Sequence, residues 1–181
     1  MASSSFDGNW DNDKLVVGDL AKTVAAVHLV AFINESNKGD EEGLPPTNHW
    51  CCFLETYDKT SVRLDMMPGY GSDGLRGKIQ IVSKEYAYTR NNVHVLSFDA
   101  VSGVTVQKIV DLIMSRGRQK YQFTPEWEGC RYWNLILIQD MVTAGYIPSG
   151  SSNQAEEAML WYWVYPQGKE KRVLRKGTFR A

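Results

Sequence analysis

The first half of the chain carries apolar residues in patterns that predict β-strands. In Lys22–Asn34, apolar and β-branched residues occupy both alternating faces, as in a central strand that is buried on both sides. His49–Tyr57 and Ser61–Met67 are separated by a three-residue turn, so the two predicted strands form a hairpin. Two more strands are expected at Lys78–Ser83, which in a longer reading reaches Tyr88, and at Val93–Asp99.

The second half switches to a helical period. Residues 105–117 carry an apolar stripe between a capping threonine and a stopping glycine. A second helix is expected to begin near Thr124-Pro125, a capping residue followed by proline, and to end at Gly145. A third is expected over roughly Gln154–Val164. Strands followed by helices predict an α+β fold, in which an antiparallel β-sheet packs against C-terminal helices.

Length and composition indicate a single domain over residues 1–181. A chain of 20.5 kDa with 43% apolar residues can bury a core without disulfides or metal. It has no apolar stretch of about 18 residues that would span a membrane. The polar, acidic beginning of the chain resembles neither a secretory signal nor a mitochondrial presequence, which predicts a cytoplasmic protein.

Charge is distributed unevenly, although the formal net charge is only −1. Residues 1–21 form an acidic N-terminal arm. Residues 166–181 form a basic C-terminal tail, whose bases include Lys171, Arg172, Arg175 and Lys176. Such a tail is usually a solvated chain end, and the alternative is a contact with a polyanion.

The cysteines and glycines argue against several kinds of site. Cys51 and Cys52 are adjacent and cannot easily bridge each other, and no C-x-x-C pair or spaced histidine indicates zinc. We therefore expect no metal and no cofactor. The glycine-rich segment Pro68–Gly77 matches neither a Walker nor a dinucleotide loop, which leaves a flexible loop or a lid over a site.

The stretch TPEWEGCRYW places Cys130 near the beginning of the second predicted helix. The free N–H groups and partial positive charge there favour a thiolate and can bind an oxyanion. A cysteine on an apolar stripe is more often a core residue, so catalysis also requires a base. His49 opens its strand and is the best partner, and Asp65 in the paired strand can orient it. His28 and His94 lie within strands and are expected to be hydrogen-bonded core histidines.

This order of residues resembles the circularly permuted papain-like superfamily over about residues 48–145. The resemblance rests on Asn48-His49-Trp50, the next strand, and Gly129-Cys130-Arg131-Tyr132-Trp133. It implies a permuted papain-like fold and Cys-His chemistry, as in lecithin:retinol acyltransferase-like enzymes, phospholipid acyltransferases and PPPDE-type peptidases. The chain departs from the acyltransferase branch in two ways: Gly129 replaces a common asparagine, and a second histidine is absent, which leaves Asp65 or no third group.

The stretches SVRLDMMPGYGSDGLRGKIQI, FTPEWEGCRYW and RKGTF are similar to a family of small fungal proteins. As a hypothesis, we place arginine-containing cyclodipeptide synthases of fungal secondary metabolism in the same group. The resemblance implies that an aminoacyl group moves from tRNA to Cys130 and that a second aminoacyl amine attacks the thioester. Glu126 and Glu128 would bind a guanidinium, and the basic tail would bind tRNA. Where they do not pack in the core, three tryptophans are expected to line a substrate pocket: Trp50, Trp127 and Trp133.

The sequence thus predicts a cysteine acyltransferase that forms an amide through a thioester on Cys130 and acts on a small-molecule or peptide substrate. A cysteine hydrolase of the same type is the second interpretation, because the same acyl-enzyme serves both reactions. A non-catalytic interaction module, in which Cys130 is a core residue, is the third.

Overall fold

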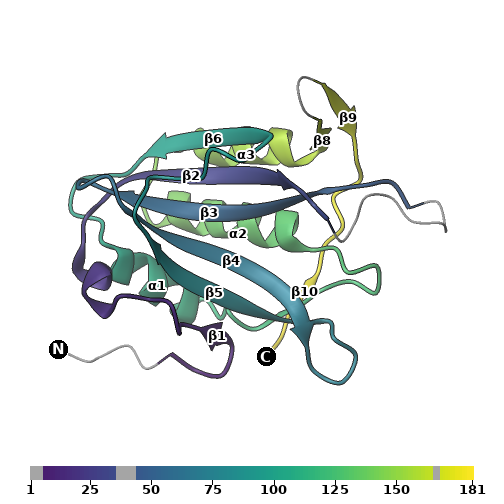
Figure 1. Cartoon of the computed structure of the whole chain (residues 1–181), viewed down its shortest axis with the longest axis horizontal. Helices are drawn as coiled ribbons and strands as arrows, with labels where there is room; N and C mark the ends of the chain where they lie inside the picture. The colour runs from purple at the N-terminus through teal and green to yellow at the C-terminus, as the bar shows by residue number, and fades with distance from the viewer. Residues whose placement is uncertain (1–5, 36–43, 165–167) are drawn as a thin grey trace.

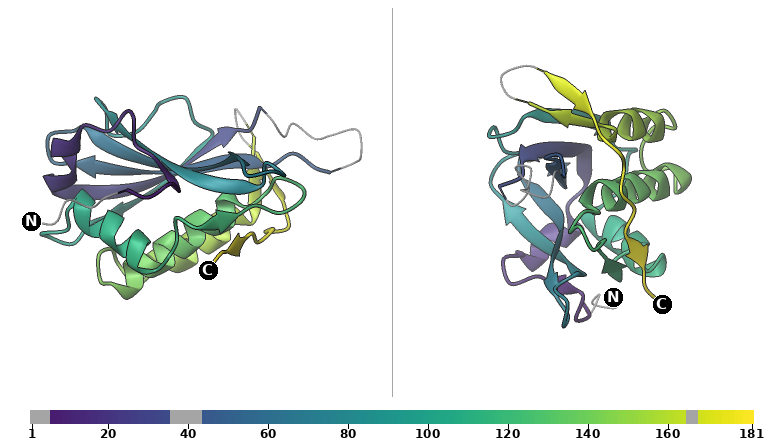
Figure 2. Two further views of the ribbon diagram at one scale, coloured as in Figure 1. Left: turned by 90° about the horizontal axis from the view of Figure 1, so that it is seen from below. Right: turned by 90° about the vertical axis from the view of Figure 1, so that its right-hand side faces the viewer.

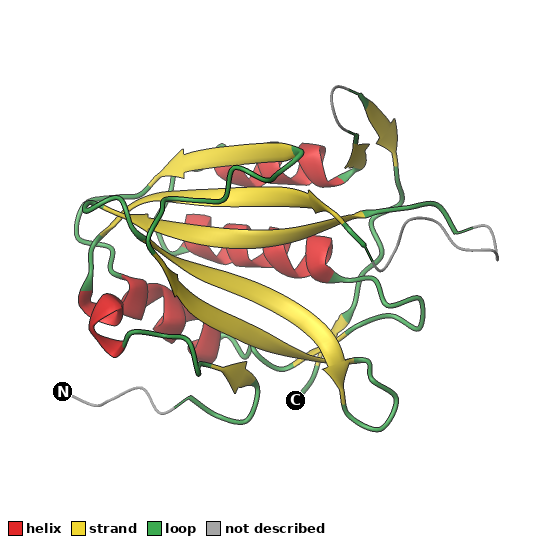
Figure 3. Cartoon of the chain, in the orientation of Figure 1, coloured by secondary structure: helices red, strands yellow, loops and turns green. Residues whose placement is uncertain are grey.

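A curled, mostly antiparallel sheet forms one layer of the molecule, and helices pack against one of its faces (Figure 1, Figure 3). The computed structural model describes residues 6–35, 44–164 and 168–181. Along the sheet the strands follow the order β10-β7-β5-β4-β3-β2-β6, and β1 pairs with β5 in parallel. The strands of this sheet are β1 (Trp10–Asp11), β2 (Val24–Ile33), β3 (Asn48–Thr56), β4 (Ser61–Tyr70), β5 (Arg76–Lys84), β6 (His94–Asp99), β7 (Tyr121–Gln122) and β10 (Thr178–Phe179).

The helices and a small hairpin complete the part of the chain that the structure describes. Viewed from below, the α-helices lie together under the sheet (Figure 2). These elements are η1 (Val17–Ala21), α1 (Val106–Ser115), α2 (Cys130–Thr143), α3 (Ser151–Met159), β8 (Trp161–Trp163) and β9 (Lys169–Lys171). Together they confirm the predicted α+β class and the antiparallel character of the sheet.

The main core lies between the sheet and the helices. Alternation along β3 turns Trp50, Cys52 and Leu54 toward this core, where they join the apolar faces of α1 and α2. The opposite face of β3 carries Cys51 and Phe53, which pack in a second, smaller cluster. The predicted central strand, β2, likewise has Val27 and Leu29 in the main core and Val30 in the smaller cluster, so apolar residues are buried on both of its faces.

A split in the sheet determines where the candidate site forms. Pairing between β3 and β4 covers only Cys52–Glu55 and Ser61–Leu64, although both strands continue beyond these residues. Figure 1 shows the two strands fanning apart, with α2 behind the opening. Asn134 of α2 donates its amide N–H to the Trp50 carbonyl oxygen at 3.0 Å. Because β4 does not pair with this part of β3, α2 supplies a hydrogen-bond partner for a backbone group of β3.

Several boundaries differ from the sequence prediction. The second helix begins at Cys130 itself, because Thr124 caps a tight turn through its contacts with Trp127 and Glu128. The third helix ends at Met159, and Trp161–Trp163 form β8. Alternating large aromatic side chains suit a strand, and the partner strand β9 was not foreseen.

The chain ends are also more ordered than expected. Within the acidic arm, Trp10 is 5% exposed and β1 pairs with β5. Within the basic tail, β10 joins the main sheet through β7. Residues 1–5 and 166–167 of these two predicted segments lie outside the described part of the chain.

Candidate active site

Cys130 is the first residue of α2, and the residue before it makes this position possible. Gly129 caps the helix with a φ of 153°, a backbone conformation that favours glycine. A Cβ atom there would lie 2.9 Å from the hydroxyl oxygen of Tyr121. That hydroxyl donates to the Gly129 carbonyl oxygen at 2.9 Å and accepts from the Gly177 N–H at 3.0 Å. Tyr121 therefore links the beginning of α2 to the C-terminal segment.

His49 and Asp65 lie on either side of the split, on β3 and β4. The Nε2 atom of His49 is 2.6 Å from Asp65 Oδ1, which is a short, charge-assisted hydrogen bond. His49 also lies close enough to Cys130 for the two side chains to shift each other's pKa. Because Nε2 faces Asp65, the other ring nitrogen, Nδ1, is left for the sulfur. The structure thus brings together all three predicted catalytic residues.

The electrostatics favour a thiolate–imidazolium pair. Burial lowers the pKa of His49, but the charge and hydrogen bond of Asp65, followed by those of Cys130, raise this pKa well above its usual value. Burial raises the pKa of Cys130, but His49, the Trp50 backbone N–H and the charge of Arg131 lower it overall. The two groups titrate as a coupled pair.

The other two cysteines provide a contrast within the same chain. Burial raises the pKa of Cys51 well above its ordinary value and raises that of Cys52 to about 12. Cys130 is itself 9% exposed, and the side chain of His49 is 21% exposed. The Cys130 sulfur has a polar neighbour in the Asn48 carbonyl oxygen, at 3.9 Å. The sulfur is therefore not enclosed by hydrocarbon alone.

Arg131 connects the beginning of α2 to neighbouring segments of the chain. Its buried guanidinium donates to the Met159 carbonyl oxygen at 2.9 Å and to the Val173 carbonyl oxygen at 2.7 Å. It also pairs with Glu128 at 3.0 Å. These contacts connect α2, α3 and the C-terminal segment, and they keep the Arg131 charge close to the thiol.

The acidic residues expected to bind a guanidinium already face arginines of the same chain. Glu128 is 8% exposed and pairs with Arg131, while Arg175 lies 3.6 Å from Glu128 and 3.5 Å from Glu126. This is a correction, because the two carboxylates do not form an open acidic pocket.

The three tryptophans assigned to a substrate pocket have different positions. Trp50 and Trp133 are 0% exposed, so they are core residues that present no surface to a substrate, and this part of the prediction is wrong. Trp127 is 53% exposed and its ring lies against Gly74. It therefore connects the glycine-rich turn to the segment that precedes Cys130.

The basic tail residues are partly neutralised within the chain. Arg172 pairs with Glu170 at 2.9 Å and donates to the Pro46 carbonyl oxygen. Arg175 faces the two glutamates described above, Lys176 lies over the Tyr132 ring, and Lys171 is exposed on β9. Two of the four predicted tRNA contacts thus already form ion pairs.

The remaining histidines lie apart from Cys130. His28 is 5% exposed and binds Ser97 Oγ at 2.7 Å and Glu55 Oε2 at 2.8 Å, which confirms a hydrogen-bonded core histidine. His94 instead stacks on Trp163 with ring centroids 3.5 Å apart, and its buried Nε2 has no hydrogen-bond partner among the described residues. Its expected hydrogen-bonded role is wrong at that atom.

Two features are absent from the described residues. Among them there is no group of three or more His, Cys, Asp or Glu side chains that could hold a metal ion. No helix in the described part of the chain is long and apolar enough to cross a membrane.

Sequence reasoning missed the groups that support the triad. Tyr121 and Asn134 hold the two ends of the first turn of α2, and neither belongs to a recognisable motif. Asn134 stands out only as a polar residue between Trp133 and Leu135, and Tyr121, between Lys120 and Gln122, lacks even that signal. Such a pattern does not reveal the partner, because the partner carbonyls belong to Gly129 and to distant Trp50.

Comparison with known proteins identifies one family. A family model described as "Domain of unknown function (DUF7770)" matches residues 27–180. No curated protein and no solved structure matches the chain significantly.

Proposed function

The chain belongs to the DUF7770 family, and we propose that it transfers acyl groups through a thioester on Cys130. The observation that carries the proposal is the group Asp65, His49 and Cys130 at the N-terminus of α2, in which Asp65 hydrogen-bonds His49 and His49 lowers the pKa of Cys130. A nucleophile, a base and a group that orients the base are the three parts that covalent acyl transfer requires.

Each residue has a defined part in the reaction. His49 holds the thiol proton as an imidazolium, and the Cys130 thiolate attacks the acyl carbonyl carbon. Free N–H groups in the first turn of α2 support the tetrahedral oxyanion. When the carbon–leaving group bond breaks, His49 returns its proton to the leaving group and a thioester remains on Cys130.

The second half of the cycle regenerates the enzyme. An acceptor amine attacks the thioester carbonyl, and His49, now neutral, removes the amine proton. The carbon–sulfur bond breaks, an amide forms, and Cys130 leaves as a thiolate beside the imidazolium. Asp65 keeps the His49 ring in position through its hydrogen bond to Nε2.

A permuted papain-like arrangement is part of this proposal. Its support is the chain order, in which the base on an early strand precedes a nucleophile on the first residue of a later helix. The aminoacyl-tRNA donor and the cyclodipeptide product follow from the resemblance alone. They predict an arginine-containing diketopiperazine in a host that expresses the protein and its absence with Cys130→Ala.

Hydrolysis is the second candidate, because water can reach the partly exposed His49 ring. Two of the three tryptophans expected to line a substrate pocket, Trp50 and Trp133, are in the core, so they give no reason to favour an amine over water as the acceptor. The choice between amine and water is decided by adding an amine to the acyl-enzyme and measuring how the acyl group divides between amide and free acid.

An acyl-trapping experiment tests the shared step. Wild-type protein is mixed with an activated aryl ester, and the acylated peptide is located by mass spectrometry. We expect a single adduct on Cys130, slower acylation with His49→Ala, and none with Cys130→Ala. Cys51→Ala is the matched control and should acylate normally. Equal, slow acylation of all three cysteines would favour the non-catalytic module.

A further inference from the structure

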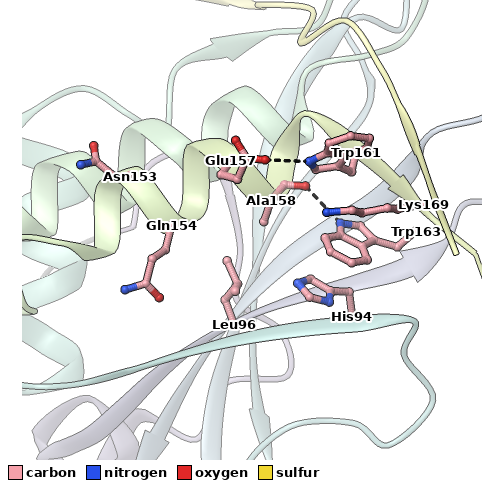
Figure 4. Close-up of a pocket in the computed structure, with 9 residues that line it drawn as sticks. All are labelled: His94, Leu96, Asn153, Gln154, Glu157, Ala158, Trp161, Trp163 and Lys169. Atoms are coloured by element: carbon pink, nitrogen blue, oxygen red, sulfur yellow. Dashed lines mark hydrogen bonds between the residues drawn. The ribbon is translucent and has the colours of Figure 1, made fainter. Parts of the chain in front are cut away.

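A groove lies between the C-terminal end of α3, the edge strand β6 and the β8–β9 hairpin (Figure 4). It encloses a volume of about 410 Å³. Its walls are mainly the rings of Trp161, Trp163 and His94, with Leu96 and Ala158 beside them. None of these residues belongs to the triad, so the groove is distinct from the residues proposed to carry out acyl transfer.

The two indole rings are held in fixed orientations. Trp161 donates its Nε1–H to Glu157 Oε1 at 3.0 Å, and Trp163 donates its Nε1–H to the Ala158 carbonyl oxygen at 3.0 Å. Both polar edges are therefore tied to α3, as the dashed lines in Figure 4 show. Side chains held in this way lose little conformational entropy when a ligand binds.

The charged and polar groups of the groove favour an anion at one side. Lys169 Nζ lies 4.3 Å from the centre of the Trp161 ring and 5.4 Å from that of Trp163. Glu157 already accepts from Trp161. Burial, followed by the charge of Lys169, lowers the pKa of His94, so the ring is neutral at pH 7 and adds no second positive charge to the groove.

We propose that this groove binds a flat aromatic group that carries a carboxylate. The aromatic ring stacks on Trp161, in the space that the Lys169 ammonium now covers, and the ammonium moves aside to pair with the carboxylate. A planar, apolar ligand face matches the indole walls, and the negative group matches the lysine.

The groove also adjoins the strand that carries the base. The Asn48 side chain accepts from the Trp163 backbone N–H at 2.7 Å and donates to the Trp163 carbonyl oxygen at 3.0 Å. Asn48 directly precedes His49. A ligand in the groove would therefore pack against an element that is fixed to the beginning of β3.

Calorimetry with three naphthalene probes tests the proposal. The probes are 2-naphthoate, neutral 2-naphthalenemethanol and cationic 2-naphthylmethylamine. We expect 2-naphthoate to bind most tightly, about fivefold more tightly than the neutral probe, which is the upper range for an exposed ion pair. Lys169→Met should abolish this difference, and Lys169→Glu should make the cationic probe the tightest.

Variants of the hairpin separate stacking from a general loss of structure. Trp161→Ala should weaken all three probes about tenfold, in the range for loss of a stacking platform. Tyr162→Ala is the matched control, because successive side chains of β8 point to opposite faces. Cys130→Ala should bind like the wild type, which keeps this result independent of acyl transfer. Equal affinity for all three probes, no binding, or the same loss with Tyr162→Ala as with Trp161→Ala would overturn the proposal.

Discussion

Replacing Asp65 with asparagine removes the negative charge beside His49 and keeps the size of the side chain. Asp65 is 7% exposed at its side chain and lies 2.6 Å from the imidazole. A hydrogen bond between charged groups contributes about 1.5–3 kcal/mol. Because about 1.4 kcal/mol corresponds to a factor of ten, the thiolate–imidazolium form should become about ten- to a hundredfold less populated relative to the neutral pair.

The pH dependence of alkylation measures this change directly. In the wild type, the lowered pKa of Cys130 means that its reaction with iodoacetamide rises at a lower pH than that of an ordinary cysteine. With Asp65→Asn, the rise in rate should move to higher pH, because less positive charge is retained on His49. Peptide mapping then gives separate rates for Cys51 and Cys52, whose raised pKa values make them slow internal references.

A matched variant shows whether the effect is specific. Asp111→Asn changes an exposed carboxylate on α1 and should leave the profile of Cys130 unchanged. The reasoning fails if Asp65→Asn has the wild-type profile, or if Cys51 reacts as fast as Cys130 in the wild-type protein.

Three further changes test the supports of the fold by chemical denaturation. Gly129→Ala should lower the free energy of unfolding by about 1–3 kcal/mol, because the backbone has φ of 153° and the new Cβ meets Tyr121; a loss under about 0.5 kcal/mol would contradict this. Tyr121→Phe should cost about 1–3 kcal/mol, because the buried Gly129 carbonyl and the partly buried Gly177 N–H lose their hydrogen bonds, and unchanged stability would argue against the link. Burial raises the pKa of Glu55, but hydrogen bonds from His28 and Lys59 lower this pKa overall. The ionised Glu55 therefore stabilises the folded protein above about pH 4.5, and this contribution is lost as the pH falls through the lowered pKa of the folded state. Glu55→Gln should therefore flatten the acid side of the stability curve, and an unchanged slope would show that other carboxylates dominate it.

The strands and the class of fold could be predicted because their signals are local. Alternation in residues 48–56 and 61–70 shows which side chains share a face, and Thr105 does cap α1 by accepting from the Lys108 N–H. The division of residues 154–164 into α3 and β8 could not be predicted in the same way. It depends on pairing with β9, which begins several residues later in the chain.

The candidate site was predictable to a similar extent. Cys130 and His49 could be selected from residue type and from their places at the beginnings of elements, and Asp65 could be selected because its strand pairs with that of His49. The neighbours could not be selected, because Trp50 and Trp133 have the same apolar character whether they line a pocket or fill a core. Only the position of α2 in the split between β3 and β4 decides that they are buried.

That split also determines when the thiol becomes reactive during folding. Cys130 contacts a strand residue 82 positions earlier in the chain. Contacts of such long range form slowly, because a large loop must close before they contribute any energy. A brief pulse of a thiol reagent during refolding would therefore time the docking of α2 without an added label. Its signal would be a cysteine whose rate of modification rises as the molecule becomes more compact, whereas Cys51 and Cys52 would become protected.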